Sequence, residues 1–279
     1  MNLKQTYTRL LSREPRFDRL VSQCVTQSQM DSICYRRWCE EELRQPFLYH
    51  RKPWEWAYIT EAIGQAGLLK PGYAGIGFGV GVEPLVAILA RHRLDILATD
   101  QDPLQARKHG WETGKSYGGA LEWLNPGELT NPEVFRAHVS FRVVDMNRIP
   151  DDLRDFDFCW SSCALEHLGS LQAGFTFIEN SLKCIKPGGL AVHTTEYNVS
   201  SNEHTITEGP TVFYRQVDLK AFGRRLRQMG YHIRFNFSTG RRPADLHVDD
   251  PPYGNGPHLK LRVGSYVVTS IGLIIRKPA

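Results

Sequence analysis

The fold is decided by residues 73–84, Tyr73-Ala74-Gly75-Ile76-Gly77-Phe78-Gly79-Val80-Gly81-Val82-Glu83-Pro84. The first part of this stretch is typical of the end of a buried strand, and Pro84 suits the first turn of the apolar helical segment that follows. The glycines between them carry no Cβ atoms, so a ligand can lie against bare backbone at a helix N-terminus. Strand, glycine turn and helix in this order predict a Rossmann-like nucleotide site.

The spacing of the glycines narrows the kind of nucleotide. The dinucleotide pattern G-x-G-x-x-G would need a glycine at Val80 or Val82 and fails in every register, whereas G-x-G-x-G is met from Gly77 to Gly81. A tight turn that only connects a strand to a helix uses the same residues. The rest of the sequence is therefore needed to distinguish a nucleotide site from a structural turn.

The bulk properties indicate one sizeable α/β domain with an N-terminal extension. The chain has 279 residues, and its 34 basic and 30 acidic residues are spread evenly, which does not favour nucleic acid as a partner. The six cysteines form no C-x-x-C pair and are typical of reduced thiols. The sequence shows no signal peptide and no apolar run of membrane-spanning length, so we expect a cytoplasmic protein without a membrane partner.

Hydrophobic periodicity divides the chain near residue 68. In residues 1–68 the apolar side chains recur at helical spacing, which predicts a helical extension or cap. Residues 69–279 predict a Rossmann-like domain. Strand-like runs there alternate with helical ones, at 73–77, 95–99, 139–144, 156–161, 189–195, 231–237 and 265–276. This alternation predicts an α/β fold with a doubly wound, mostly parallel, seven-stranded sheet. The last two runs are joined by a Pro/Gly-rich loop, so we expect them to pair as an antiparallel hairpin at one edge. Residues 107–138 are expected to be loop-rich with one short helix.

Four sequence blocks occur in an order that is specific to one family. The first is Gly77-x-Gly79-x-Gly81, and the second is Ala98-Thr99-Asp100. The third is Val144-Asp145-Met146-Asn147, followed by Phe156-Asp157-Phe158 through Leu168, and the fourth is Leu182 to Gly189. With these blocks, residues 70 to 277 resemble a class I S-adenosylmethionine-dependent methyltransferase of the small-molecule type. The resemblance implies S-adenosyl-L-methionine as cofactor and S-adenosyl-L-homocysteine as product.

The resemblance also implies which residues hold the cofactor. The turn containing Gly75, Gly77, Gly79 and Gly81 would bind its carboxylate end. Asp100 would accept the ribose hydroxyls, with capping of a following helix as the alternative role. Gln101 would lie along the adenine, and Ser162 would complete the site after the run 156–161. Asp145 would take the adenine amino group, with a turn cap as its alternative, and Met146 would pack on the ring.

One position departs from the family pattern. Members usually carry an acid where this chain has Gly75, and that acid steers the amino group of the methionine part. The nearest substitute is Glu83, although a helix dipole also favours an acid in a first turn for structural reasons alone.

Methyl transfer to a hydroxyl needs a group that removes the proton, at the carboxyl ends of the runs 156–161 and 189–195. Glu196 and His167 are the first candidates, followed by Asn198 and His247, while His193 is interpreted as a hydrogen-bonded core residue. A divalent-metal site is an alternative that we do not favour; it would be built from His247, Asp249, Glu196 and His204. Residues 241–260 are predicted to form a substrate wall, and the helix at Trp54 to Tyr58 to cover the cofactor.

The sequence thus predicts a methyltransferase acting on a small hydroxylated acceptor, a sugar or a natural-product intermediate, by O-methylation. Methylation of nitrogen or carbon, an NAD-dependent oxidoreductase and a non-catalytic cofactor-binding scaffold are the alternatives. A nucleic-acid methyltransferase would carry Asn/Asp-Pro-Pro-Tyr after the run 156–161, but that position holds Ser162 to Leu165, and Asp250 to Tyr253 lies elsewhere. A homo-oligomer is compatible with this sequence.

Overall fold

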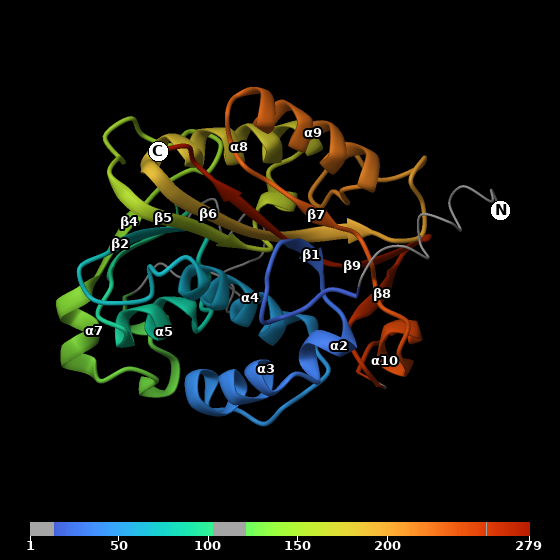
Figure 1. Ribbon diagram of the computed structural model, residues 1–279, viewed down its shortest axis with the longest axis horizontal. Helices are drawn as coiled ribbons and strands as arrows, with labels where there is room; N and C mark the ends of the chain where they lie inside the picture. Colours follow the sequence, from blue (N-terminus) through green and yellow to red (C-terminus); the bar gives the residue numbers. More distant parts are fainter. Residues whose placement is uncertain (1–13, 103–120, 255) are drawn as a thin grey trace.

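The computed structural model describes residues 14–102, 121–254 and 256–279, and consists of a central sheet with helices on both faces (Figure 1). Five strands at one side of the sheet are parallel. They are β4 (Val139–Val143), β3 (Asp95–Asp100), β2 (Ala74–Phe78), β5 (Phe156–Ser162) and β6 (Ile185–Asn198), in this spatial order. The order reverses at β2, where β3 lies on one side and β5 on the other. Open α/β sheets bind ligands at such a point.

The other side of the sheet is mixed and contains a strand that the sequence did not predict. β9 (Tyr266–Arg276) runs antiparallel to β6, and β1 (Ser22–Cys24) lies between β9 and β7 (Phe235–Asn236). β1 and β7 pair in parallel there, whereas β9 is antiparallel to its neighbours. The expectation of helix at residues 22–24 was therefore wrong. The expected hairpin of the last two runs was also wrong, because β1 separates them; in the described residues their direct pairing is one bridge, His232 to Arg276.

The same side of the sheet holds a second addition, β8 (Lys260–Val263), which pairs antiparallel with the first part of β9. Together with β1 it brings the described sheet to nine strands, while all seven predicted runs contain a strand. The predicted α/β, mostly parallel architecture is confirmed. Residues 103–120, which include much of the segment expected to be loop-rich, lie outside the described residues; the remainder of that segment contains α7 (Pro132–His138).

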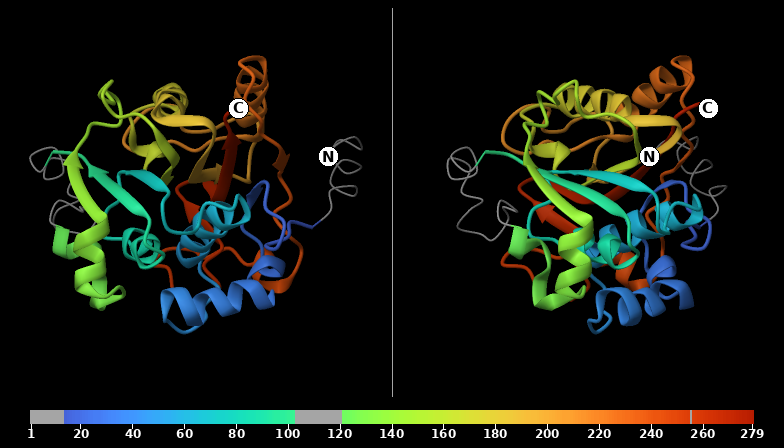
Figure 2. Two further views of the ribbon diagram at one scale, coloured as in Figure 1. Left: turned by 60° about the vertical axis from the view of Figure 1, so that its left-hand side comes forward. Right: turned by 90° about the vertical axis from the view of Figure 1, so that its left-hand side faces the viewer.

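Helices α8 (Leu171–Cys184) and α9 (Gln216–Gln228) cover one face of the sheet, and α4 (Arg51–Gln65), α5 (Leu85–Arg91) and α7 cover the other (Figures 1 and 2). The side chains of β5 alternate between the two faces of the sheet and pack against both helical layers. Phe158 and Trp160 belong to the core under α4 and α5, and Cys159 between them belongs to the core under α8. This alternation is the two-residue period of a strand buried on both faces.

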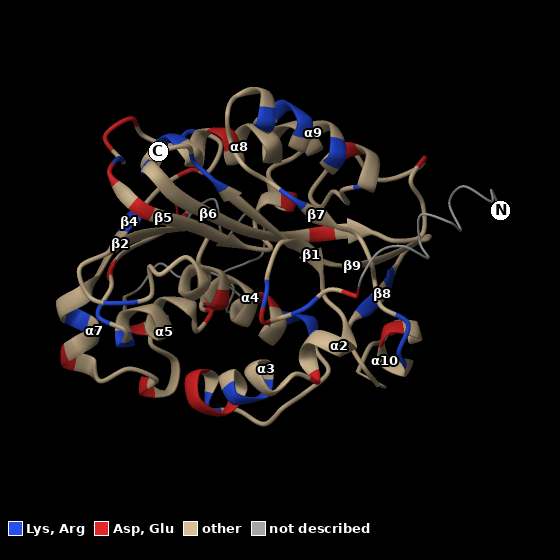
Figure 3. Cartoon of the chain, in the orientation of Figure 1, with Lys and Arg blue, Asp and Glu red and all other residues tan. Residues whose placement is uncertain are grey.

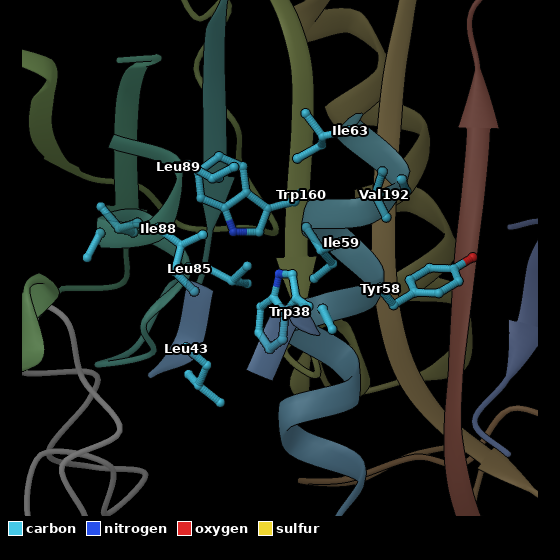
Figure 4. Packing of buried hydrophobic residues seen from close by; sticks show 14 of the residues in the cluster. Trp38, Leu43, Tyr58, Ile59, Ile63, Leu85, Ile88, Leu89, Trp160 and Val192 are labelled. Atoms are coloured by element: carbon cyan, nitrogen blue, oxygen red, sulfur yellow. The ribbon is translucent and has the colours of Figure 1, made fainter. Parts of the chain in front are cut away.

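The N-terminal residues share this core. Helix α3 (Ile33–Trp38) and the helical turn Cys39–Leu43 bring Trp38 and Leu43 under α4 and α5, close to Trp160 of β5 (Figure 4). The remaining described helical elements are short: α2 (Gln27–Met30), α10 (Pro243–Leu246) and the turns Leu121–Leu124, Pro126–Glu128 and Leu165–His167. The hydrophobic core is therefore continuous across residue 68.

Charged residues are distributed over both helical layers and the loops (Figure 3). Among the described residues, the search for a helix long and apolar enough to cross a membrane found none.

Candidate active site

The site lies where the carboxyl ends of β2, β5 and β6 meet the first turn of α4. Strand β2 leads into the glycine loop, β5 ends at Ser162, and Glu196 lies near the end of β6. Helix α4 contacts both β5 and β6 and brings Arg51 and Lys52 over this edge of the sheet. The sequence predicts that the helix at Trp54 to Tyr58 covers the cofactor. Trp54 and Tyr58 are fully buried in the core, and the charged first turn of this helix faces the strand ends.

The glycine loop has the backbone of a ligand cradle. Gly79 and Gly81 have φ angles of 59° and 54°, in the left-handed region that favours glycine. The N–H of Gly81 donates to Asp100 Oδ2 at 3.0 Å, and the N–H of Gln101 donates to Asp100 Oδ1 at 2.8 Å. Asp100, which ends β3 and is 6% exposed, thus ties the loop to the neighbouring strand. Sequence reasoning placed Asp100 and the loop at one site, and the structure brings them together.

The glycines before the loop are explained by aromatic packing. A Cβ atom on Gly75 would lie 2.3 Å from the ring of Phe158, and one on Gly77 would lie 2.3 Å from the ring of Trp160. No side chain fits at either position without displacing a buried ring. The acid that the family carries at position 75 is therefore excluded by the neighbouring strand β5.

Glu83, the predicted substitute for that acid, faces Lys52 from the first turn of α4. Lys52 Nζ lies 3.4 Å from Glu83 Oε1 and 3.0 Å from Glu55 Oε2. Burial raises the pKa of Glu83, and the ammonium of Lys52 only partly opposes this shift. Burial would also raise the pKa of Glu55, but there Lys52 and Arg51 outweigh it and the pKa is lowered. The two carboxyl groups thus differ in how fully their charge is compensated.

Glu196 is held by an arginine from the same helical turn. Arg51 Nη1 lies 2.5 Å from Glu196 Oε1, 3.1 Å from Ser270 Oγ of β9 and 3.5 Å from Glu55 Oε1. Burial lowers the pKa of Arg51, but the carboxylates of Glu196 and Glu55 outweigh it, and the guanidinium stays charged. The pair is largely buried, with exposed side-chain fractions of 14% for Arg51 and 10% for Glu196.

Glu196 also belongs to a compact acidic group. One ligand atom from each of Cys163, Glu166 and Glu196 lies within 4.8 Å of the others. Cys163 has a φ of 44°, a left-handed conformation that is costly for a residue with a side chain and recurs at functional sites. Burial raises the pKa of Glu166, and the Glu196 carboxylate adds to that shift while His167 opposes it. Thr195 Oγ1 donates to Glu166 Oε2 at 3.0 Å.

Several buried polar atoms around this edge have no hydrogen-bond partner among the described residues. They are Glu83 Oε2, Glu166 Oε1, Glu196 Oε2, Ser162 Oγ and Gln101 Nε2. A buried polar atom without a partner costs free energy, so native proteins keep few of them unless a ligand or water satisfies them. The unpaired atoms come from residues at or just after the ends of β2, β3, β5 and β6, so they lie along one edge of the sheet.

The predicted adenine residues lie beside the loop. Met146 is buried, and its Sδ would be 3.0 Å from a Cβ on Gly79, so the thioether packs against the glycine loop. Asp145 is exposed, and its Oδ1 accepts the N–H of Asn147 at 2.8 Å. Asp145 therefore closes the turn after β4, which is the alternative role weighed from the sequence.

Two other predicted residues have structural partners. His167 Nδ1 donates to the carbonyl of Pro210 at 2.8 Å, in the loop before α9. Asn198 is 2% exposed; its amide donates to the carbonyl of His204 at 3.1 Å, and its Oδ1 accepts the N–H of Ser200 at 3.0 Å. Both side chains organise the segment after β6. Glu166, next to His167 in the same turn, is the residue that reaches the acidic group around Glu196.

His193 has the environment expected of a core histidine. Ser161 Oγ lies 2.8 Å from His193 Nδ1, the residue is fully buried, and burial lowers its pKa to about 3. The ring is neutral at physiological pH and belongs to the core rather than to the ligand edge.

The metal-site alternative is not supported by the positions of its four residues. Glu196 pairs with Arg51, whereas Asp249 Oδ2 lies 2.6 Å from His258 Nδ1 in the loop before β8. The group of metal-ligand type found in the described residues is Cys163, Glu166 and Glu196 instead. His247 Nε2 is buried, and a Cβ on Gly256 would lie 3.0 Å from it.

A groove opens beside the first turn of α4. It has a volume of about 550 Å³ and lies between residues 48–50 and the segments 253–254 and 256–258. The loop predicted as a substrate wall therefore forms one side of the groove. Asp250 to Tyr253, which has the sequence Asp-Pro-Pro-Tyr, forms a turn here, and it lies far in sequence from the end of β5.

Sequence reasoning missed Arg51, Lys52, Glu55 and Cys163 as site residues. A charged first turn normally indicates a solvated helix end, which is why Arg51 and Lys52 were overlooked. A usable signal was Glu55 between Trp54 and Trp56. A carboxylate between two large aromatic residues in a helix is placed near buried surface, where an acid needs a partner.

Neither a protein-family model nor a curated protein matches the sequence. Among solved structures, the chain is similar to a protein of Galdieria sulphuraria described as a sarcosine dimethylglycine methyltransferase. The TM-score is 0.52 at 12% identity, covering 99% of this chain and 97% of that one. The magnesium protoporphyrin IX methyltransferase of Synechocystis PCC 6803, crystallised with S-adenosylhomocysteine, matches with a TM-score of 0.49 at 12% identity, over 81% and 85% of the two chains.

At these identities the likeness concerns the fold, and the first structure matches over nearly the whole of both chains. The parallel strand order, the antiparallel β9 and the glycine loop at the reversal point agree with that likeness. This chain has the fold of the class I S-adenosylmethionine-dependent methyltransferases.

Proposed function

We propose that the protein transfers a methyl group from S-adenosyl-L-methionine to a hydroxyl group of a small acceptor, such as a sugar or a natural-product intermediate. The observation that carries the proposal is the set of unpaired buried polar atoms around the glycine loop. This set offers partners for a ligand that carries donors, acceptors and positive charge, as this cofactor does.

The charges of the edge favour a cationic ligand. Four carboxyl groups, from Glu55, Glu83, Glu166 and Glu196, surround the two cations Arg51 and Lys52. Burial raises the pKa of Glu83 and of Glu166, and a neighbouring carboxylate adds to each shift, so negative charge on these two groups is unfavourable here. A ligand with a net positive charge would relieve it.

Each part of the cofactor has a candidate partner. Lys52 would meet the carboxylate of the methionine part together with N–H groups of the glycine loop. Glu83 would accept the ammonium, taking the role of the acid that Phe158 excludes from position 75. Asp100 would hold the ribose, and Gln101, Met146 and Ser162 would line the adenine side, with Asp145 shaping the turn next to them.

When bound, the cofactor supplies an electrophilic methyl group on its sulfonium sulfur. After the transfer, that sulfur is the neutral thioether of S-adenosylhomocysteine. Glu196 would accept the hydroxyl proton of the acceptor while the acceptor oxygen forms its bond to the methyl carbon. Arg51 holds Glu196 in place through Oε1 and leaves Oε2 without a partner among the described residues, so this oxygen can take the proton. Alignment of the two reactants at this edge would supply much of the rate.

Two measurements test the proposal. Isothermal titration calorimetry with S-adenosylmethionine, S-adenosylhomocysteine and NAD measures which nucleotide binds; we expect both methionine cofactors to bind and NAD not to bind. A coupled assay of S-adenosylhomocysteine release across sugars, phenols and amines then identifies the acceptor, with hydroxyl compounds expected to be turned over. Absence of methionine-cofactor binding would refute the proposal, and turnover of amines alone would refute O-methylation.

A further inference from the structure

The groove beside α4 is connected to the proposed methyl-transfer edge through a single residue. The backbone N–H of Arg51 donates to the carbonyl of His258 at 3.1 Å, while the Arg51 side chain reaches Glu196 at 2.5 Å. The N–H of His258 in turn donates to the carbonyl of Tyr49 at 2.7 Å. These backbone hydrogen bonds fix the two sides of the groove to each other and to the helix that carries Arg51.

The histidine in the groove wall is oriented by a buried carboxylate. Asp249 is 1% exposed, and its Oδ2 lies 2.6 Å from His258 Nδ1 and accepts the N–H of Gly254 at 3.0 Å. A carboxylate on Nδ1 fixes the ring and its tautomer, and directs Nε2 away from Asp249. The imidazole thus presents one defined hydrogen-bonding atom.

Aromatic rings form the rest of the wall. His50 stacks on His258 with ring centroids 4.4 Å apart and planes at 21°. Tyr253 meets His258 edge-on at 5.9 Å and 87°, and its hydroxyl donates to the carbonyl of Arg262 at 2.8 Å. His50 Nδ1 accepts the N–H of Lys52 at 3.1 Å, and burial lowers the pKa of His50 to about 4, so this ring is neutral. The rings are held by their partners rather than free to rotate.

The described lining residues of the groove include no Asp, Glu, Lys or Arg. Its volume of about 550 Å³ lies within the range typical of small-molecule sites, about 300–1,000 Å³. Flat rings with one fixed polar atom suit a neutral ring that carries hydroxyl groups, since ring faces can pack on the aromatics and a hydroxyl can bond to the imidazole.

We infer that this groove is the acceptor-binding site, and that it takes a neutral, hydroxyl-bearing ring whose hydroxyl is bound by His258. The inference rests on the proposed function and adds where the acceptor lies and which chemical class it belongs to. Arg51 links the groove to the proposed base, because its backbone N–H donates to the carbonyl of His258 and its side chain contacts Glu196. His258 is here a binding residue, and Asp249 positions it.

The test separates acceptor binding from cofactor binding. The probe is the best neutral acceptor found in the S-adenosylhomocysteine-release assay, compared with the matching uronic acid and amino sugar, which carry opposite charges. For His258→Gln we expect the KM of the neutral acceptor to rise about tenfold, because one well-placed hydrogen bond in a partly buried site is lost. The Kd of S-adenosylhomocysteine and kcat at saturating acceptor should stay within about twofold.

Two further variants distinguish a loss of acceptor binding from a local folding defect caused by the His258 substitution. Leu48→Trp narrows the groove from a lining residue that is 61% exposed, so it should fold normally and raise the same KM. His138→Gln is the matched control, because His138 pairs with Asp95 at 2.9 Å at the opposite end of the parallel strands; its KM should not change.

The outcomes for the two proposals are distinct. If the wild-type protein does not bind S-adenosylhomocysteine, the proposed function fails. If it binds and turns over, but neither His258→Gln nor Leu48→Trp changes the acceptor KM, the groove is not the acceptor site. A preference for the uronic acid or the amino sugar over the neutral ring would likewise overturn the inferred substrate class.

Discussion

The guanidinium of Arg51, in the first turn of α4, lies 2.5 Å from the carboxylate of Glu196 near the end of β6. The pair links α4, which precedes the glycine loop in the sequence, to β6, the last of the five parallel strands. It fixes one oxygen of Glu196, while the other has no partner in the described part of the chain. A carboxylate held in this way is oriented and still able to accept a proton.

The first prediction concerns this carboxylate. Glu196→Gln keeps the shape and the contact with Arg51 but cannot accept the proton, so kcat should fall by about 10²–10⁴-fold, the usual contribution of a general base. S-adenosylhomocysteine affinity should stay within about threefold. The control is Glu42→Gln, which alters a comparable partly buried pair with Arg91. His167→Ala should lower kcat much less, because the His167 ring is hydrogen-bonded to the carbonyl of Pro210. A larger loss of kcat in His167→Ala than in Glu196→Gln would identify His167 as the base.

The second prediction tests the replacement of the missing acid. Glu83→Gln should weaken S-adenosylmethionine binding by about tenfold or more, because a hydrogen bond between charged groups is lost in a largely buried place. Calorimetry at neutral pH measures the change. Glu133→Gln, an exposed acid in the first turn of α7, is the control and should bind normally. Equal affinities in the two variants would remove Glu83 from the cofactor site.

The third prediction is steric. Gly75→Asp restores the acid typical of the family, yet its Cβ would lie 2.3 Å from the Phe158 ring. We expect it to destabilise the protein by about 1–3 kcal/mol or more, the usual cost of overpacking a core, and not to tighten cofactor binding. Gly75→Ala should be destabilised to a similar extent, since the clash begins at Cβ. Gly64→Ala, whose Cβ would meet Leu69 at 3.7 Å in ordinary contact, should leave the thermal midpoint unchanged or raised.

The fourth prediction concerns pH and Glu166. Burial raises the pKa of this carboxyl above its usual value of 4.5, so the folded state holds its proton more tightly than the unfolded state. Its contribution to stability is therefore lost as the pH rises from about 4.5 through the folded pKa. Glu166→Gln should be more stable than wild type at neutral pH without cofactor, and the difference should vanish near pH 4. Denaturant unfolding at several pH values measures it; a variant less stable at pH 7 would contradict the raised pKa.

The fifth prediction has the opposite sign. The pKa of His193 is lowered by burial from 6.5 to about 3, so the unfolded state binds a proton that the folded state refuses. This part of the stability is present above pH 6.5 and is lost as the pH falls toward 3. An NMR titration should find the His193 ring neutral down to about pH 4. Protonation of His193 near pH 6 would contradict its place in the core.

The central architecture was predictable because its signals are local. The alternating apolar runs predicted the parallel strands. The glycine spacing and Asp100 predicted the glycine loop and the neighbouring strand β3, whose Asp100 accepts a hydrogen bond from the loop. Strand β1 was not predictable in the same way. Ser22–Cys24 is three residues long, and Ser22 Oγ accepts the N–H of Ile274, a contact between opposite ends of the sequence that no local pattern records.

The site was only partly predictable for a similar reason. Glu196 could be chosen because an acid at a strand end has few structural uses, but its partner Arg51 lies on a helix whose first turn looks solvated. His167 and Glu166 are adjacent in sequence, and only the turn geometry after β5 decides that Glu166 reaches the acidic group. His258 carries no motif, and its relation to Asp249 and His50 depends on how the loop before β8 folds back.

The insertion of β1 between β9 and β7 has a consequence for the order of events during biosynthesis. Ribosomes make the chain from its N-terminus, so residues 22–24 emerge long before residues 235–236 and 271–272, which form the two sides of their slot. Until those residues emerge, residues 22–24 lack both of their partner strands and are open to wrong pairing. Strand β1 can therefore take its place in the sheet only after both strands that flank it have been made.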